Sequence, residues 1–319
     1  MGFSITQMEY VMAVHRLGHF AKAAEACHVS QPTLSMQIQK LEEDLGVVIF
    51  DRSKKPILLT EIGKKLVEQI QAALFEIKKI EGIVSQQNLG VAHGEITLGV
   101  IPTVAPYLLP RMLAALDSSY PEVQVKIHEL QTHQIIEALN SDEIDVGLLA
   151  TPLNLPQVFE HALFYEPFFV LSKKGDELAD ARKIKYSSLS MKNIWLLEEG
   201  HCLRSQVVDI CARQRDKGLI RKYSFESGSL ETLKNLVDQY GGYTLLPQLA
   251  TETLGPNSIV IPFERPIPAR EIGLVYRREH HKTELIEILS EAILKSLPEG
   301  LKKLRLKDLN VLPVDGDSK

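Results

Sequence analysis

The fold of the amino-terminal part is decided by residues 30–46, which read SQPTLSMQIQKLEEDLG. Ser30 is a favourable N-cap residue, proline follows in the first helical turn, and Gly46 is a common helix terminator. From Leu34 to Leu45 apolar side chains recur at steps of four, three and four residues. The stretch therefore predicts a helix with one face in a core and a polar face turned outward.

Two shorter helices are predicted before this one. Residues 6–17 carry apolar side chains at helical spacing, with Thr6 as the expected cap and Gly18 as the stop. Residues 20–27 are rich in alanine, so another helix can approach closely. Two short helices, a tight turn and a third helix with a polar outer face form a helix-turn-helix. Glutamine and serine on the third helix suit hydrogen bonds with base edges in the major groove.

The next stretch predicts a wing and a long helix. Residues 47–50 and 57–59 have the pattern of two short strands around a basic turn, which would lie along DNA phosphates. Thr60 is placed to cap a helix over 61–88, whose apolar residues repeat at steps of three and four. This pattern is typical of a helix that pairs with its copy. A helix lying on its own domain has the same periodicity.

Charge is informative only locally. The net charge of -5 does not by itself favour nucleic acid, and residues 1–88 hold ten basic and ten acidic side chains. A phosphate-binding surface needs a local excess of positive charge. Alone, a basic cluster is most simply a solvated face, but here it follows a predicted helix-turn-helix. Its members are Arg52, Lys54, Lys55, Lys64 and Lys65.

Length and composition limit the class of protein. With 319 residues, 45% of them hydrophobic, the chain has room for about two globular domains. No apolar run approaches the roughly 18 residues that suggest a membrane span. Charged residues interrupt the first apolar stretch, so we expect no signal peptide. Three cysteines are too few for a disulfide scaffold, which makes a reducing cytoplasm the expected compartment.

After a predicted hinge at 89–94, strands and helices alternate, which predicts an α/β domain with a largely parallel sheet. We expect two lobes, lobe I at about 95–165 plus 268–300 and lobe II at about 166–267, with a ligand at their boundary. The tail, 301–319, has no assigned role. The predicted strands are 95–100, 123–129, 146–149, 167–171, 194–197, 223–226, 244–246 and 272–276, and the helices are 108–120, 133–140, 202–215, 230–238 and 283–296.

The amino-terminal half resembles the LysR-type transcriptional regulators. The resemblance rests on the runs at 20–24, 30–35, 37–42, 45–46 and 50–52. It implies a winged helix-turn-helix over 1–60, a dimerising linker helix, and a two-lobed effector domain like a periplasmic binding protein. It also implies a homotetramer (a dimer of dimers) in the bacterial cytoplasm and nucleoid, bound to double-stranded promoter operators and working with RNA polymerase.

The same resemblance assigns the DNA contacts. Seven residues would enter the groove and three would hold phosphate. The groove set is Ser30, Gln31, Pro32, Thr33, Ser35, Gln37 and Lys40, and the phosphate set is Arg52, Lys54 and Lys55.

The effector half resembles the members of this family that sense hydrogen peroxide. The matching runs are 99–110, 129–134, 197–204 and 270–277, and Cys202 and Cys211 have the spacing of those sensors' disulfide pair. The resemblance implies that Cys202 attacks peroxide, that Cys211 resolves the product as a disulfide, and that a thiol reductant restores both. It implies no cofactor. The implied peroxide-binding set is Thr103, Thr132, His201 and Arg270.

Both the neighbours of the two cysteines and helix geometry bear on this assignment. His201 and Arg204 flank Cys202 and could favour its thiolate. On one continuous helix, nine residues span about 13.5 Å and turn through about 900°, so the two thiols would face opposite sides. A disulfide requires Cα atoms within roughly 7 Å. If 202–215 is a helix in the dithiol form, oxidation must refold it.

Other interpretations stay open. A metabolite could bind between the lobes with the cysteines incidental, or the chain could be a thiol peroxidase, which would leave the helix-turn-helix unexplained. Cys27 is expected to be a small apolar core residue. No metal site is expected, because the adjacent His280 and His281 lack a third ligand. Tyr240 stands where the family usually has a small residue, which bears on the packing of that lobe.

Overall fold

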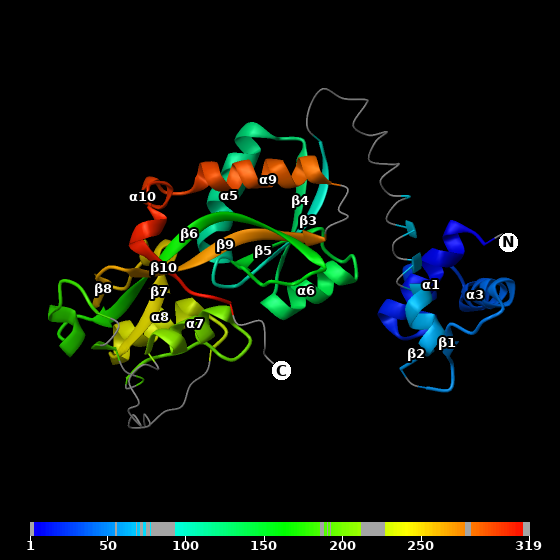
Figure 1. Ribbon diagram of the computed structural model, residues 1–319, viewed down its shortest axis with the longest axis horizontal. Coiled ribbons are helices and arrows are strands. Elements are labelled where there is room, and N and C mark those ends of the chain that lie inside the picture. Colours follow the sequence, from blue (N-terminus) through cyan, green and yellow to red (C-terminus); the bar gives the residue numbers. More distant parts are fainter. Residues whose placement is uncertain are drawn as a thin grey trace. The chain divides into compact units, whose positions relative to one another are not determined.

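The computed structural model describes residues 3–54, 56–67, 69–70, 73–74, 77, 93–185, 188–189, 191, 193–211, 227–277 and 282–314. The chain divides into two compact units, Met1–Gly90 and Val91–Lys319 (Figure 1). Within the described residues, no helix has both the length and the apolar character needed to cross a membrane.

The first unit is a winged helix-turn-helix, as predicted. Its elements are α1 (Ile5–Leu17), α2 (Phe20–Ala26), α3 (Gln31–Leu45), β1 (Phe50–Asp51) and β2 (Leu58–Leu59). Ser30 caps α3 by accepting a hydrogen bond from the Thr33 N–H, and Gly46 ends the helix with a φ of 67°. β1 and β2 pair antiparallel through two residues each. The wing strands are therefore shorter than the sequence suggested.

The predicted cap of α1 is wrong. Ser4, and not Thr6, caps the helix, because Ser4 and Gln7 form a capping box in which each side chain accepts from the other's backbone N–H. The alanines of α2 do allow close packing, since Ala23 and Ala24 are buried among the three helices.

Thr60 caps the next helix, as predicted, by accepting from the Gly63 N–H at 2.9 Å. The described residues between 61 and 77 are helical. The remainder of the predicted linker helix, and 89–92 of the predicted hinge, lie outside the described residues.

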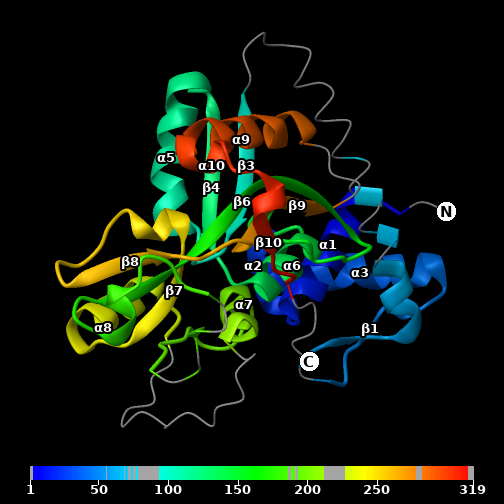
Figure 2. The ribbon, with the colours of Figure 1, turned by 60° about the vertical axis from the view of Figure 1, so that its left-hand side comes forward.

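The second unit is an α/β domain. α5 and α9 pack together on one face of its sheet, and α6 covers the other (Figures 1 and 2). Its elements are β3 (Gly94–Val100), α5 (Ala105–Ser119), β4 (Val123–Glu129), α6 (Thr132–Asn140), β5 (Val146–Thr151), β6 (Val158–Lys173), α7 (Cys202–Cys211), α8 (Leu230–Tyr240), β7 (Tyr243–Pro247), β8 (Ser258–Pro262), β9 (Ile267–Arg277), α9 (Thr283–Ser296), α10 (Glu299–Lys302) and β10 (Leu309–Val311).

The sheet is mixed rather than largely parallel, which corrects the prediction. β3 runs parallel to β4 and β5, but β9 is antiparallel to both β5 and β6, and β6 is antiparallel to β7 and β8. The cause is two long strands, β6 and β9, that run side by side in opposite directions. Residues 194–197 form isolated bridges instead of a strand, and the predicted strand 223–226 lies outside the described residues.

β6 and β9 connect two hydrophobic cores. Along β6, Val158 and Phe164 belong to the first core, whereas Phe168 and Val170 belong to the second. This arrangement is the two-lobed architecture expected for the effector domain. Tyr240, at the end of α8, is 75% exposed. Its ring therefore takes little part in the packing of the second core, which settles the question raised by its size.

Candidate functional site

Cys202 is the first residue of α7 and is half-buried. Its Sγ lies 3.0 Å from the Thr132 hydroxyl oxygen, close enough for a hydrogen bond. Thr132 in turn begins α6, directly after β4. A helix amino terminus carries partial positive charge, which favours a thiolate over a thiol. The structure thus brings together two of the residues that the sequence assigned to one site.

His201 is nearly enclosed, with 6% of its surface exposed. Its Nε2 lies 3.4 Å from Gln131 Nε2 and 3.7 Å from Glu198 Oε1. Burial lowers the pKa of His201, and the Glu198 carboxylate only partly opposes this shift. A neutral imidazole is therefore favoured at neutral pH, so His201 serves as a hydrogen-bonding group rather than a fixed positive charge.

Arg204, the other suggested source of positive charge, donates from Nη1 to the Leu197 carbonyl at 2.5 Å. That contact ties the guanidinium to the segment before α7.

Thr103 and Arg270 form a second, fully buried group. Arg270 Nη1 donates to the Thr103 hydroxyl at 2.8 Å, and Nη2 donates to the Thr103 carbonyl at 3.1 Å. The guanidinium also binds Glu166 Oε2 through Nε and Nη2, at 2.9 and 2.8 Å. Arg270 and Glu166 are 1% and 0% exposed, so the charges of this pair are compensated without water.

Glu166 is a residue that the sequence analysis missed. Its signal was a lone carboxylate inside the apolar stretch 162–171, where a charge is retained only with a partner. Glu166 lies directly opposite Arg270 in the β6–β9 register, where β6 passes from one core to the other. Its second oxygen accepts from the Leu249 N–H at 2.8 Å.

Topology places the two groups at the same edge of the sheet. Thr103 follows β3 and Thr132 follows β4, and these parallel strands end in register at Val100 and Glu129. Ligands of open α/β sheets bind at the carboxyl ends of the strands. The predicted peroxide-binding residues therefore gather at an edge where ligand binding is typical of the architecture.

Cys211 closes α7 and has the opposite surroundings. Its side chain is fully buried in the second core, with the Tyr243 hydroxyl 4.0 Å from Sγ. Burial raises the pKa of the Cys211 thiol to about 11, and the Tyr243 hydroxyl partly opposes the shift. Cys202 and Cys211 are not joined by a disulfide, and they lie on one continuous helix. As the geometric argument requires, they cannot bond while α7 is intact.

The predicted DNA-contacting residues lie on α3 and the wing. Gln31, Pro32, Thr33 and Lys40 are exposed, whereas Ser35 and Gln37 are half-buried. The Gln37 amide oxygen accepts from Gln7 Nε2 at 3.1 Å. Ser30 is engaged as the cap of α3, and Lys55 lies outside the described residues.

Arg52 stabilises the packing of the first unit and is also a candidate phosphate contact. It donates to Glu42 Oε2 at 2.9 Å and stacks 5.0 Å above the Phe20 ring centroid. Glu42 also accepts the backbone N–H groups of Ile49 and Phe50, so the pair joins α3 to the wing. Lys54, in contrast, is an exposed residue of the wing turn.

Comparison with known proteins agrees with both units. The model for "Bacterial regulatory helix-turn-helix protein, lysR family" matches residues 5–64, and the model for "LysR substrate binding domain" matches residues 90–298. The chain belongs to the LysR family. This LysR-family chain is 38% identical over 292 residues to the Escherichia coli K12 protein named "DNA-binding transcriptional dual regulator OxyR", covering 91% of this chain and 94% of that protein.

A second relative is the "Hydrogen peroxide-inducible genes activator" of Dickeya chrysanthemi, 37% identical over 94% of this chain and 98% of that protein. Among solved structures, a full-length OxyR variant of Pseudomonas aeruginosa matches with a TM-score of 0.79 and 32% identity, covering 96% and 99% of the two chains. A hydrogen peroxide-bound OxyR mutant of Corynebacterium glutamicum matches with a TM-score of 0.61 and 29% identity, covering 95% of each chain.

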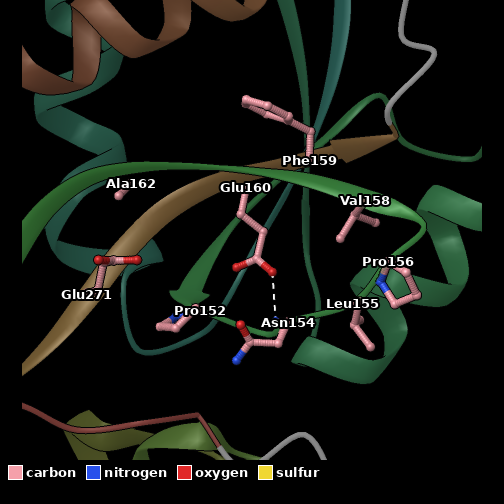
Figure 3. A pocket seen from close by; sticks show the side chains of 9 residues that line it. All are labelled: Pro152, Asn154, Leu155, Pro156, Val158, Phe159, Glu160, Ala162 and Glu271. Atoms are coloured by element: carbon pink, nitrogen blue, oxygen red, sulfur yellow. Dashed lines mark hydrogen bonds between the residues drawn. The ribbon is translucent and has the colours of Figure 1, made fainter.

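A separate hollow of about 570 Å³ lies beside the 152–156 loop (Figure 3). Its lining includes neither cysteine and no residue of the predicted peroxide-binding set. Glu160 points into it but already accepts two backbone N–H groups at 2.8 Å, and Glu271 accepts the Thr151 hydroxyl at 2.7 Å. The two carboxylates that line this hollow are thus already hydrogen-bonded to the 152–156 loop and to the residue before it.

In the described part of the chain, no group of three or more His, Cys, Asp or Glu side chains could hold a metal ion. His280 and His281 lie outside it. Cys27 is partly buried against the core of the first unit, where burial raises the pKa of its thiol.

Proposed function

We propose that this LysR-family protein is a transcription regulator that responds to hydrogen peroxide through a reversible Cys202–Cys211 disulfide. The observation that carries the proposal is the contrast along α7. Cys202 begins the helix 3.0 Å from the Thr132 hydroxyl, and Cys211 ends it inside a core. Two thiols on one helix, one accessible and one stored, suit a switch that must refold to close.

The chemistry needs two thiols and one peroxide. The Cys202 thiolate attacks one peroxide oxygen, the O–O bond breaks, and a sulfenic acid forms. The leaving hydroxide takes up the proton that the thiol had released and becomes one water. The Cys211 sulfur then attacks the sulfenic sulfur, a disulfide forms, and a second water leaves. The two thiols together lose two electrons. A cellular dithiol reductant would return both electrons and restore α7.

The surrounding residues have distinct roles in this proposal. The Thr132 hydroxyl donates to the Cys202 thiolate and His201 helps to bind the peroxide. Arg270 occupies a lone pair of the Thr103 oxygen, which leaves the Thr103 hydroxyl hydrogen to be donated elsewhere. Such donors stabilise charge that develops on the leaving oxygen. Glu166 holds Arg270 in place.

The decisive experiment is peptide mapping by mass spectrometry without reductant, after brief exposure to near-stoichiometric hydrogen peroxide. We expect a Cys202–Cys211 cross-link that a dithiol reverses and that Cys202→Ser abolishes. Two free thiols in a protein that stays folded would end the peroxide proposal. A small organic ligand detected by calorimetry would then favour a metabolite-responsive regulator, and rapid multiple turnover with reductant would favour a peroxidase.

For the first unit, we propose that α3 enters the major groove of promoter operators while the wing holds phosphate. Lys54→Ala should then weaken binding equally on all sequences and reduce its salt dependence, whereas Gln31→Ala should weaken the cognate operator preferentially. Footprinting would supply the operator, and titrations on operator and random DNA would compare the variants. Equal losses on both DNAs for both variants would contradict this division of contacts.

The assembly and its setting follow the family. We propose a homotetramer, a dimer of dimers joined partly through the helix after Thr60, that acts in the bacterial cytoplasm and nucleoid. Refolding of α7 would alter how the subunits are arranged on DNA and so change contacts with RNA polymerase. Sedimentation of the dithiol and disulfide forms would test this arrangement.

A further inference from the structure

The C-terminal segment, to which the sequence assigned no role, is folded onto the effector domain. β10 extends the sheet by pairing parallel with β9, with Leu309 opposite Ile267 and Val311 opposite Ala269. The Leu312 N–H donates to the Ala269 carbonyl at 2.8 Å, so the segment is anchored directly beside Arg270. In Figure 1 it runs from α10 along β9 towards α7.

The next contact of this segment is with the middle of α7. Gln206, four residues after Cys202, is fully buried, and its Nε2 lies within hydrogen-bond distance of the Leu312 and Pro313 carbonyls, at 3.4 and 3.5 Å. Among the described residues, its buried Oε1 has no hydrogen-bond partner. Burying an unpaired acceptor is costly, so an apolar residue would fill this place at lower cost. What the Gln206 amide contributes in return is its hydrogen bonding to the Leu312 and Pro313 carbonyls.

The apolar contacts point the same way. Leu312, 8% exposed, belongs to the core that contains Leu203, Val207 and Cys211 of α7. Val314 belongs instead to the first core. The segment 309–314 thus pairs with β9 and packs into both cores. It also contacts α7, the helix that begins at Cys202 and ends at Cys211.

We propose that residues 309–314 form a clamp that holds α7 in its dithiol conformation, with Gln206 as the positioning residue. This inference rests on the disulfide switch proposed above. Closing the disulfide must bring Cα atoms from about 13.5 Å to within roughly 7 Å, which unwinds a turn next to Gln206. Contacts made only in the dithiol form favour that form. The clamp therefore raises the reduction potential of the Cys202–Cys211 pair.

The test is a redox titration of the full chain against dithiothreitol, with the disulfide fraction read by mass spectrometry. One variant ends after Asp308 and so lacks the clamp, and its matched control ends after Val314 and keeps it. Without the clamp we expect the equilibrium constant to shift about tenfold towards the disulfide, a potential lower by about 30 mV. The control should match the wild-type protein.

A point variant guards against misfolding of the shortened chain. Gln206→Leu removes the donor to the Leu312 and Pro313 carbonyls and should shift the equilibrium in the same direction, whereas Ser205→Ala on the same helix should not. If the chain ending after Asp308 and Gln206→Leu both had the reduction potential of the wild-type protein, the clamp alone would be overturned. This holds even if their melting temperatures were lower. A wild-type chain that forms no Cys202–Cys211 disulfide would overturn the proposed switch, and the clamp with it.

Discussion

The two ends of α7 carry the same side chain in opposite environments. At the amino end, Cys202 is partly exposed, contacts the Thr132 hydroxyl, and benefits from the positive end of the helix dipole. At the carboxyl end, Cys211 is fully buried, its pKa is raised to about 11, and the dipole is unfavourable to an anion. The two ends of one ten-residue helix thus hold a reactive thiol and a stored one.

The reactivity of a cysteine in α7 depends on its position in the helix and not on its residue type. A thiol becomes a nucleophile when its thiolate is accessible and stabilised, and it becomes an inert core residue when neither holds. The same helix also keeps the sulfurs apart. In the proposed switch the first oxidation therefore takes place in the folded site, and the second requires the core around Cys211 to open.

The largest expected effect comes from removing either thiol. Cys202→Ser should abolish reaction with peroxide at this site, because the accessible nucleophile is gone. Cys211→Ser should still consume peroxide but accumulate a sulfenic acid on Cys202, which dimedone labelling and intact mass would detect. If Cys211→Ser were the unreactive variant and Cys202→Ser the labelled one, the order of the two thiols would be reversed.

Alkylation should show the same contrast without mutation. In the folded dithiol protein at neutral pH, iodoacetamide should modify Cys202 at least about 100-fold faster than Cys211, because burial and a raised pKa both withhold the Cys211 thiolate. In concentrated urea the two rates should converge. Peptide mass spectrometry over time gives both rates, and similar rates in the folded protein would contradict the stored state of Cys211.

The hydroxyl groups next to the two sulfurs should differ in their effect on the rate at which Cys202 reacts with peroxide. Thr132→Val removes a hydrogen-bond donor to the thiolate and should slow the reaction of Cys202 with peroxide by about tenfold or more, since a hydrogen bond to a charged group is worth roughly 1.5–3 kcal/mol. Tyr243→Phe is the matched change at the other end, where the contact is 4.0 Å long. It should leave that rate nearly unchanged. Stopped-flow measurement would compare them, and equal slowing would remove the distinction.

The smallest effect concerns stability against pH. The pKa of Cys211 is about 11 in the folded state, against 9.0 for the unperturbed thiol. The unfolded chain therefore loses this proton first, so the contribution is fully present below pH 9 and is lost as pH rises towards 11. Between pH 7 and pH 10 the wild-type protein should lose about 1.4 kcal/mol of unfolding free energy more than Cys211→Val. Urea denaturation at both pH values gives these free energies. An equal loss of unfolding free energy in the wild-type protein and in Cys211→Val would contradict this prediction.

The sequence anticipated local structure best where a short-range signal dominated. Ser30, Pro32 and Gly46 mark the ends of α3 through capping and backbone preferences that act within a turn. The cap of α1 was misplaced because serine and threonine both stand near its start, and only the pairing of Ser4 with Gln7 distinguishes them. The mixed sheet was missed because strand direction depends on partners far along the chain.

The family resemblance carried the candidate site further than the residues alone could. Motif matches pointed to Thr103, Thr132, Cys202 and Arg270, but not to the buried carboxylate of Glu166 that holds Arg270. Arg52 was expected to hold phosphate, and its bond to Glu42 came only with the fold. Glu166 is 104 residues from Arg270 and Glu42 is ten residues from Arg52. Neither pair has a sequence pattern that indicates which opposite charge a charged residue will contact.

The sequence by itself determined the winged helix-turn-helix, the two-lobed α/β architecture and the helical spacing of the two cysteines. These features depend on periodicity, capping and motif spacing, all of which act over a few residues. Tertiary structure alone decided that Thr132 meets Cys202, that Cys211 is buried, and that residues 309–314 reach Gln206. Such contacts join segments about 30 to more than 100 residues apart, and only the packing of the whole domain brings them together.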